Sequence, residues 1–170
     1  MERFDVRRGL VKEVSSKGGL GELAKEFFES IQQSSETSFQ ASHGIMTSIG
    51  ARYENGALLV NVTNVPPDFD NPEEMKDAMD ARRRWTSFLD KATGYSSKKR
   101  GDKAKEWAKK ASKAKSAISA SKHFMEMSDD LPDDKIKQAN DLIREIESLL
   151  DANDNTKAAG RAEKLNKLFS

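Results

Sequence analysis

The chain has 170 residues, a formal net charge of +1 and 36% hydrophobic residues, which suits one domain or a small domain with an added helical element. It contains no cysteine, which excludes a disulfide framework, a thiolate zinc site and a cysteine nucleophile. No stretch approaches about 18 consecutive apolar residues, and the N-terminus lacks the apolar core of a signal peptide. We therefore expect a cytoplasmic protein with no membrane partner.

The N-terminal half of the chain predicts a mixed helix and strand module. Alternation over residues 3–8 indicates a short strand, and apolar residues at helical spacing from Leu20 to Ile31 predict an amphipathic helix of about four turns. From Thr37 to Val65 the apolar period changes to two, which predicts a meander of three strands. The dipeptide Asn55-Gly56 predicts a tight turn between the last two of them.

A second helix is expected after the meander. Pro66-Pro67 ends the last strand, and the acidic segment 70–74 has the chemistry of a helix start. The helix is predicted to run to about Ala92 and to end at Thr93-Gly94. Both helices should cover one sheet face. The prediction for residues 1–95 is therefore an α+β fold, a two-layer β-α-β-β-β-α sandwich with an antiparallel meander.

A basic helical stretch from Tyr95 to His123 follows this module. It holds ten Lys or Arg residues against two acids, a local balance of +8 in a chain whose total is +1. Its apolar seam contains one large side chain, Trp107, which we expect to be a buried anchor; the seam comprises Ala104, Trp107, Ala111, Ala114, Ile118, Ser121 and Met125. Lysines occupy the other faces.

The C-terminal tail predicts a helical hairpin that docks on the basic helix. The segment 128–134 interrupts the basic helix, and two apolar stripes follow on either side of a turn at Asn153-Asp154-Asn155. We therefore expect a helical extension over residues 96–170, with the basic helix at 97–123 and the hairpin at 130–169.

The run from Arg84 to Arg100, together with Ser42-His43-Gly44 and the strand hairpin, resembles an archaeal family of uncharacterised proteins. The fold of that family is similar to the TATA-binding-protein domain. The resemblance covers roughly residues 3–105 and implies a β-α-β-β-β-α arrangement with no established activity. The helical tail lies outside it, so nothing about the role of the tail follows from the resemblance.

The residues that catalysis or metal binding would need are sparse. His43 and His123 lack metal-ligand spacing, and the acidic residues between 68 and 80 are better explained by capping of the second helix. The segment 17–21 is glycine-rich but lacks the spacing of a phosphate-binding loop. We expect no enzyme activity, no metal and no cofactor.

The basic helix favours binding to a polyanion, because lysines on several faces of one helix can contact phosphates. The candidate nucleic-acid-binding residues are Lys98, Lys99, Arg100, Lys103, Lys105, Lys109, Lys110, Lys113 and Lys115. RNA or the ribosome is slightly preferred over DNA, since no recognition helix or dimer motif is evident. A solvated helix whose lysines serve only solubility explains the same charges equally well.

Two further surfaces stay open. The sheet face opposite the helices is expected to be polar and without aromatic residues, which does not support base stacking; it would carry Gln40, Ser42, Ser48, Arg52, Leu59, Asn61 and Thr63. The alternative function is a protein–protein adaptor that uses residues 124–170, where the charge balance is −4. Tail residues such as Ile136, Ile143 and Leu165 would then carry most of the affinity.

Overall fold

The computed structural model describes all 170 residues and divides the chain into two compact units, Met1–Lys103 and Ala104–Ser170. The division falls inside the basic helix, whereas the boundary expected from the sequence lies between residues 95 and 96. None of the helices combines the length and the apolar character that a membrane span requires. Each unit is described by itself below.

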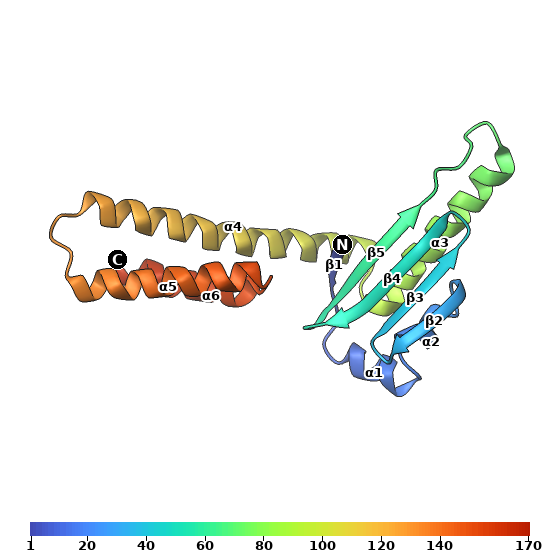
Figure 1. Cartoon of the computed structure of the whole chain (residues 1–170), viewed down its shortest axis with the longest axis horizontal. Helices are drawn as coiled ribbons and strands as arrows, with labels where there is room; N and C mark the ends of the chain where they lie inside the picture. Colours follow the sequence, from blue (N-terminus) through green and yellow to red (C-terminus); the bar gives the residue numbers. More distant parts are fainter. The chain divides into compact units, whose positions relative to one another are not determined.

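The first unit has an α+β fold, as predicted. Its five strands form one antiparallel sheet in the order β1-β5-β4-β3-β2, and three helices cover one face of that sheet (Figure 1). The strands are β1 (Glu2–Asp5), β2 (Glu29–Ser35), β3 (Ser38–His43), β4 (Met46–Glu54) and β5 (Ala57–Asn64). The helices are α1 (Leu10–Ser16), α2 (Leu20–Ala24) and α3 (Pro72–Thr93).

The core of this unit lies between the sheet and the helices, because strand side chains alternate between the two faces. Phe39 and Phe88 are fully buried, and their rings meet edge to face with centroids 5.6 Å apart. Phe28 joins them, with its centroid 5.1 Å from that of Phe88. On the opposite face, Gln40, Gly50 and Asn61 are neighbours across β3, β4 and β5, so this face is polar as expected.

Three local signals in the sequence act as predicted. Asn55 and Gly56 adopt positive φ angles of 49° and 74° between β4 and β5, as a tight hairpin turn requires. The side chain of Asn71 accepts a 3.1 Å hydrogen bond from the Glu73 amide at the start of α3. Gly94 ends α3 with a φ of 73°, and a Cβ there would lie 2.9 Å from the Cβ of Arg7. Only glycine fits this position without strain.

The four-turn helix expected from Leu20 to Ile31 is wrong. The helix ends at Ala24, and the residues that follow form β2, which pairs with β3 at the edge of the sheet. Ser30 has a positive φ of 48°, which an α-helix does not allow. Leu20 and Phe28 are buried in the core, so the apolar spacing correctly indicates burial. The hydrogen bonds between β2 and β3, however, hold the backbone after Phe28 in an extended conformation. Helix α1 and strand β2 are both additions to the predicted order.

The second unit is helical, and the predicted hairpin is confirmed. It contains the larger part of α4 (Ser97–Met127), which begins in the first unit, together with α5 (Asp133–Asp151) and α6 (Asn155–Leu168). Small side chains dominate the buried surfaces and let the helices approach closely. The buried residues are Ala114, Ala117 and Ile118 of α4, Ala139, Ile143 and Ile146 of α5, and Ala158, Ala162 and Leu165 of α6.

The seam of α4 is only partly as predicted. Ala114, Ile118 and Ser121 are buried, but Trp107 is only partly buried and lies outside the core of the second unit. The side-chain amide of Asn155 donates a 3.1 Å hydrogen bond to the main-chain carbonyl of Trp107. Asn155 is the first residue of α6, so the N-terminal end of this helix lies beside the main chain of Trp107.

Candidate nucleic-acid interface

Arg100 is the candidate that the structure sets apart from the others. Its side chain is only 6% exposed, and the guanidinium is paired with the Asp90 carboxylate near the end of α3. It also donates hydrogen bonds to the Tyr95 carbonyl at 2.6 Å and to the Ser97 hydroxyl at 3.0 Å. These partners take up three of the five guanidinium N–H groups, and the side chain is almost fully buried, so Arg100 joins α3 to the first turn of α4 and is poorly placed to contact a phosphate.

The remaining candidates of the first unit are lysines in the first two turns of α4. Lys98 and Lys99 are exposed, and their ammonium groups have no acidic partner. The ammonium of Lys103 lies 5.8 Å from the centroid of the Tyr95 ring, a cation–π geometry. The first turn of α4 contains no acidic residue. Positive charges at a helix N-terminus interact unfavourably with the helix dipole. A bound anion would therefore relieve this repulsion at Lys98 and Lys99.

In the second unit, three α4 lysines point to the hairpin. Lys113 makes a 2.7 Å ion pair with Glu163 of α6, and Lys122 makes a 3.3 Å ion pair with Glu147 of α5. Lys110 donates a 3.2 Å hydrogen bond to the hydroxyl of Thr156. The hydrogen bond from Lys113 holds the pKa of Glu163 below its ordinary value. These three lysines therefore help to fix α4 on α5 and α6.

The other three α4 lysines of this unit carry no ion pair. Lys105, Lys109 and Lys115 are exposed, on sides of α4 that the buried residues Ala114 and Ile118 do not occupy. Lys105 and Lys109 are one helical turn apart and share a face. The candidate set from the sequence contains five of these six lysines, all except Lys122, and the packing separates the six into two groups of three with different surroundings.

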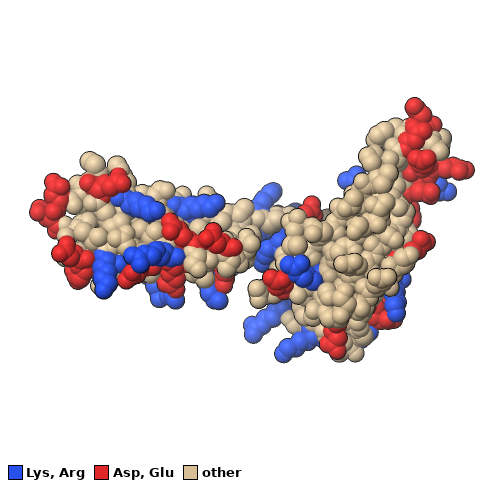
Figure 2. Space-filling model, viewed as in Figure 1, with Lys and Arg blue, Asp and Glu red and all other residues tan.

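Basic residues do not form one continuous patch on the face of the second unit that is visible in Figure 2. Blue and red side chains are interspersed there over α5 and α6. Several of these charges form pairs within the unit, including Arg161 with Glu145 at 2.6 Å. Residues 124–170 carry a net charge of −4, so the excess of positive charge in this unit belongs to α4.

Comparison with known proteins identifies the N-terminal part of the chain. The family model of a domain of unknown function, DUF5611, matches residues 1–106. The chain belongs to this family. No curated protein and no solved structure matches the chain. The DUF5611 region contains the whole first unit and the first three residues of the second, so Lys98, Lys99 and Lys105 lie inside it and Lys109 and Lys115 lie beyond it.

His43 is the one histidine of the DUF5611 region, and its side chain is only 13% exposed. Its Nε2 lies 3.9 Å from the Asp80 carboxylate, and that carboxylate accepts a 2.8 Å hydrogen bond from Arg84. The hydrogen bond from Arg84 lowers the pKa of Asp80. The Nδ1 atom of His43 is buried without a partner, and its ring packs near Phe28. No group of three or more His, Asp or Glu side chains is arranged to hold a metal ion.

The tail residues named for an adaptor surface are not on the surface. Ile143 and Leu165 are buried in the core of the second unit, and Ile136 is partly buried. A partner could reach the first two only by opening the hairpin. The exposed apolar side chains of this unit lie instead at the end of α4, where Met127 is 72% exposed and Phe124 is 41% exposed.

Proposed function

We propose that this DUF5611 protein is a non-catalytic nucleic-acid-binding protein that contacts phosphates through exposed lysines of α4. RNA or the ribosome is preferred slightly over DNA. The same proposal includes the finer identity that the resemblance implies, an archaeal protein with a TATA-binding-protein-like domain, and a cytoplasmic location. The five-stranded sheet with helices on one face supports the fold part of this identity.

The observation that carries the proposal is the set of exposed α4 lysines without an acidic partner. These are Lys98 and Lys99 in the first unit and Lys105, Lys109 and Lys115 in the second. Arginines elsewhere in the second unit are paired with carboxylates, as Arg144 and Arg161 are. Each phosphate that a lysine neutralises releases condensed counterions, which favours binding without any sequence preference.

The preference for RNA rests on what the interface lacks. Base stacking does not contribute to this preference, because the open sheet face carries no aromatic side chain in the row of Gln40, Gly50 and Asn61. The other helices of the second unit pack against α4 and leave no separate recognition helix. Contacts to phosphates then dominate the binding, and the shape of the nucleic acid determines whether RNA or DNA is preferred.

The two groups of lysines in the second unit provide a matched test. The first variant replaces Lys105, Lys109 and Lys115 with Gln. The control replaces Lys110, Lys113 and Lys122 with Gln, which removes the same charge from the same helix but takes it from lysines that already have partners. Both are titrated against a single-stranded RNA and a DNA duplex at two salt concentrations.

The first variant should bind unrelated sequences more weakly and with a shallower salt dependence. The expected loss of slope is up to about 0.9 per phosphate contact on a duplex and about 0.7 on a single strand. The control should keep most of the slope. An unchanged slope in the first variant, or equal loss in both, would contradict the assignment of phosphate contacts to Lys105, Lys109 and Lys115.

A protein adaptor is the second candidate, and the exposed Phe124 and Met127 favour it. An apolar contact at the end of α4 would survive nuclease treatment of a native lysate, whereas a nucleic-acid link would not. Replacing both residues with Gln should abolish such a contact without unfolding the unit. If association persists in this variant or vanishes with nuclease, the adaptor function fails.

A further inference from the structure

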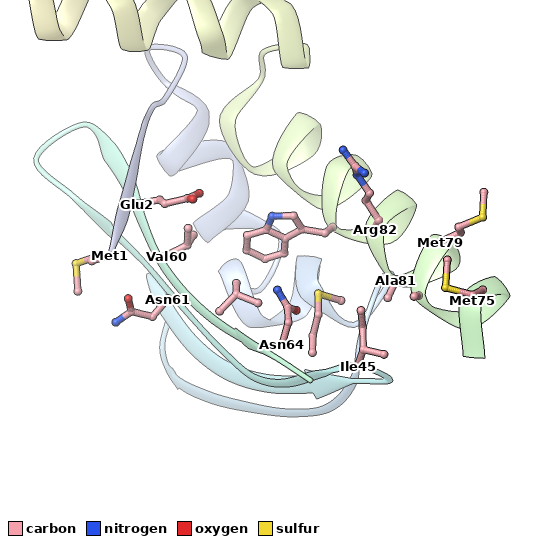
Figure 3. Close-up of a pocket in the computed structure, with 14 residues that line it drawn as sticks. Met1, Glu2, Ile45, Val60, Asn61, Asn64, Met75, Met79, Ala81 and Arg82 are labelled. Carbon is pink, nitrogen blue, oxygen red and sulfur yellow. The ribbon is translucent and has the colours of Figure 1, made fainter. Parts of the chain in front are cut away.

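The first unit contains a cavity of about 660 Å³ between α3 and the β1–β5–β4 side of the sheet (Figure 3). Its volume lies in the range of small-molecule sites, roughly 300–1,000 Å³. The walls are mainly apolar and include Met46, Val60, Val62, Met79, Ala81 and Trp85. The cavity is separate from the exposed lysines of α4, none of which lines it.

Some apolar side chains at this cavity are not fully buried in the core of the unit. Trp85 packs on one side against Phe28 and Phe88, with centroids 6.0 Å and 5.6 Å away, yet it is only partly buried and also lines the cavity. Met79 is 55% exposed. A flat ring and a flexible thioether at the wall of a cavity suit an apolar ligand, because both lose water when the ligand enters.

Arg82 is the only lysine or arginine whose side chain lines this cavity. It makes no hydrogen bond and no ion pair, whereas Arg84 is paired with Asp80 on the same helix at 2.8 Å. The helix offers it no acid, since the residues three and four positions away are Ala78, Met79, Trp85 and Thr86. An unpaired guanidinium beside apolar walls is complementary to a carboxylate.

We propose that this cavity binds a small amphipathic carboxylate, with its apolar body along Trp85 and Met79 and its carboxylate on Arg82. Glu2 limits the charge of the ligand. It extends from β1 toward α3, on the same side of the sheet as Val60, while Asn61 points away (Figure 3). A second anionic group on the ligand would meet this carboxylate, so a monoanion is favoured over a dianion.

Three probes with the same tail separate the contribution of the head group. Decanoate, decanol and decylamine are titrated below their micelle-forming concentrations against the full chain in a Trp107→Phe background. Trp85 is then the only tryptophan and reports occupancy of the cavity by its fluorescence. Decanoate should bind at least about tenfold more tightly than decanol or decylamine, given the strength of a charge-assisted hydrogen bond. A parallel titration with 2-naphthoate distinguishes a ring from an alkyl chain as the apolar body.

Two variants and one control locate the site. Arg82→Gln should reduce decanoate affinity about tenfold and leave decanol unchanged. Arg83→Gln removes the same charge one residue later, at a position that does not line the cavity, and should leave all affinities unchanged. Ala78→Leu fills the cavity and should abolish binding of every probe, with circular dichroism showing that α3 is retained.

Several results would overturn the proposal. One is the absence of saturable binding by any carboxylate probe. Another is equal binding of decanoate and decanol, because Arg82 would then contribute nothing. Equal losses in Arg82→Gln and Arg83→Gln would assign the effect to general charge. Tighter binding of decylamine that disappears in Glu2→Gln would show that the cavity takes a cation.

Discussion

The hydroxyl of Tyr53 on β4 donates a 2.6 Å hydrogen bond to the main-chain carbonyl of Ala92 in the last turn of α3. Carbonyls in the last turn of a helix have no partner within the helix, so they need one from elsewhere. Both residues are buried, which excludes water as the alternative acceptor or donor. This bond therefore fixes the end of α3 on the sheet, just before Gly94 turns the chain.

Replacing Tyr53 with Phe should destabilise the first unit. The change keeps the ring and leaves the Ala92 carbonyl buried without a partner, which costs about 1–3 kcal/mol. Urea denaturation followed by circular dichroism measures the loss. Since Tyr95 is not part of this contact, Tyr95→Phe serves as the control and should change stability by less than about 0.5 kcal/mol.

Tyr53 also predicts a loss of folding stability at alkaline pH. Burial raises the pKa of Tyr53 well above its ordinary value of 10.0. The unfolded chain therefore releases this proton first as the pH rises, and the folded state binds more protons. Stability from Tyr53 is fully present below pH 10 and is lost above it. The wild-type chain should thus lose more stability than Tyr53→Phe between about pH 10 and 11, and parallel curves would argue against a buried phenol.

Local signals in the sequence predicted the elements whose cause is local. Asn71 caps α3 through an amide two residues away, and Asn55-Gly56 turns the hairpin through its own φ angles. Strand β2 has no such signal. Its side chains are mostly exposed because it lies at the sheet edge, so no period-two pattern marks it, and its backbone is set by pairing with β3. The helical spacing of Leu20, Phe28 and Ile31 was the stronger pattern and gave the wrong element.

The candidate site shows the same limit. Charge alone identified α4 as the basic element, but it cannot tell which cation is already paired. Lys113 and Glu163 are 50 residues apart in sequence, and their contact follows from how α6 packs on α4. Arg100 differs again, because its partners lie close in sequence: Asp90 near the end of α3, Tyr95 between the two helices and Ser97 at the start of α4. The amino-acid sequence alone does not reveal that the Arg100 guanidinium is buried.

Arg100→Gln should destabilise the first unit without changing nucleic-acid affinity in the folded protein. The substitution removes a charged hydrogen bond to Asp90 and a bond to the Tyr95 carbonyl, for a loss of about 2 kcal/mol. Breaking a fully buried ion pair would cost more stability. Here the Asp90 side chain is half exposed, so water can solvate its carboxylate when Arg100 is replaced. Lys99→Gln, one residue earlier and exposed, is the control and should stay within about 0.5 kcal/mol in urea unfolding. Weaker RNA binding by folded Arg100→Gln would return this residue to the interface.

Ala162→Leu should destabilise the second unit by overpacking. Ala162 is fully buried in a core that also holds Ala139 and Ala158. Three added carbon atoms have no space there, and the expected loss is about 1–3 kcal/mol. Ala108→Leu is the control, because Ala108 is exposed on α4 and both residues favour helix. Thermal unfolding by circular dichroism should separate the two variants, and equal stability would mean that the helices tolerate a wider spacing.

The ion pair between Lys113 and Glu163 predicts a measurable pKa change. Lys113 lowers the pKa of Glu163 below its ordinary value of 4.5, first through the 2.7 Å hydrogen bond and then through its charge. Lys113→Gln should raise this pKa toward 4.5, while Lys115→Gln, two residues later and unpaired, should leave it unchanged. A pH titration of the glutamate side-chain carboxyl signals by NMR measures both.

The sign of the accompanying stability change follows from linkage. A lowered pKa in the folded state gives stability that is present above pH 4.5 and lost as the pH falls through the folded value. The wild-type chain should therefore lose more stability on acidification than Lys113→Gln, while Lys115→Gln should follow the wild type. If Lys113→Gln leaves the Glu163 pKa unchanged, Lys113 is as free as Lys115 in solution. It would then join the lysines proposed to contact phosphate, and the control variant with Lys110, Lys113 and Lys122 replaced should weaken RNA binding as well.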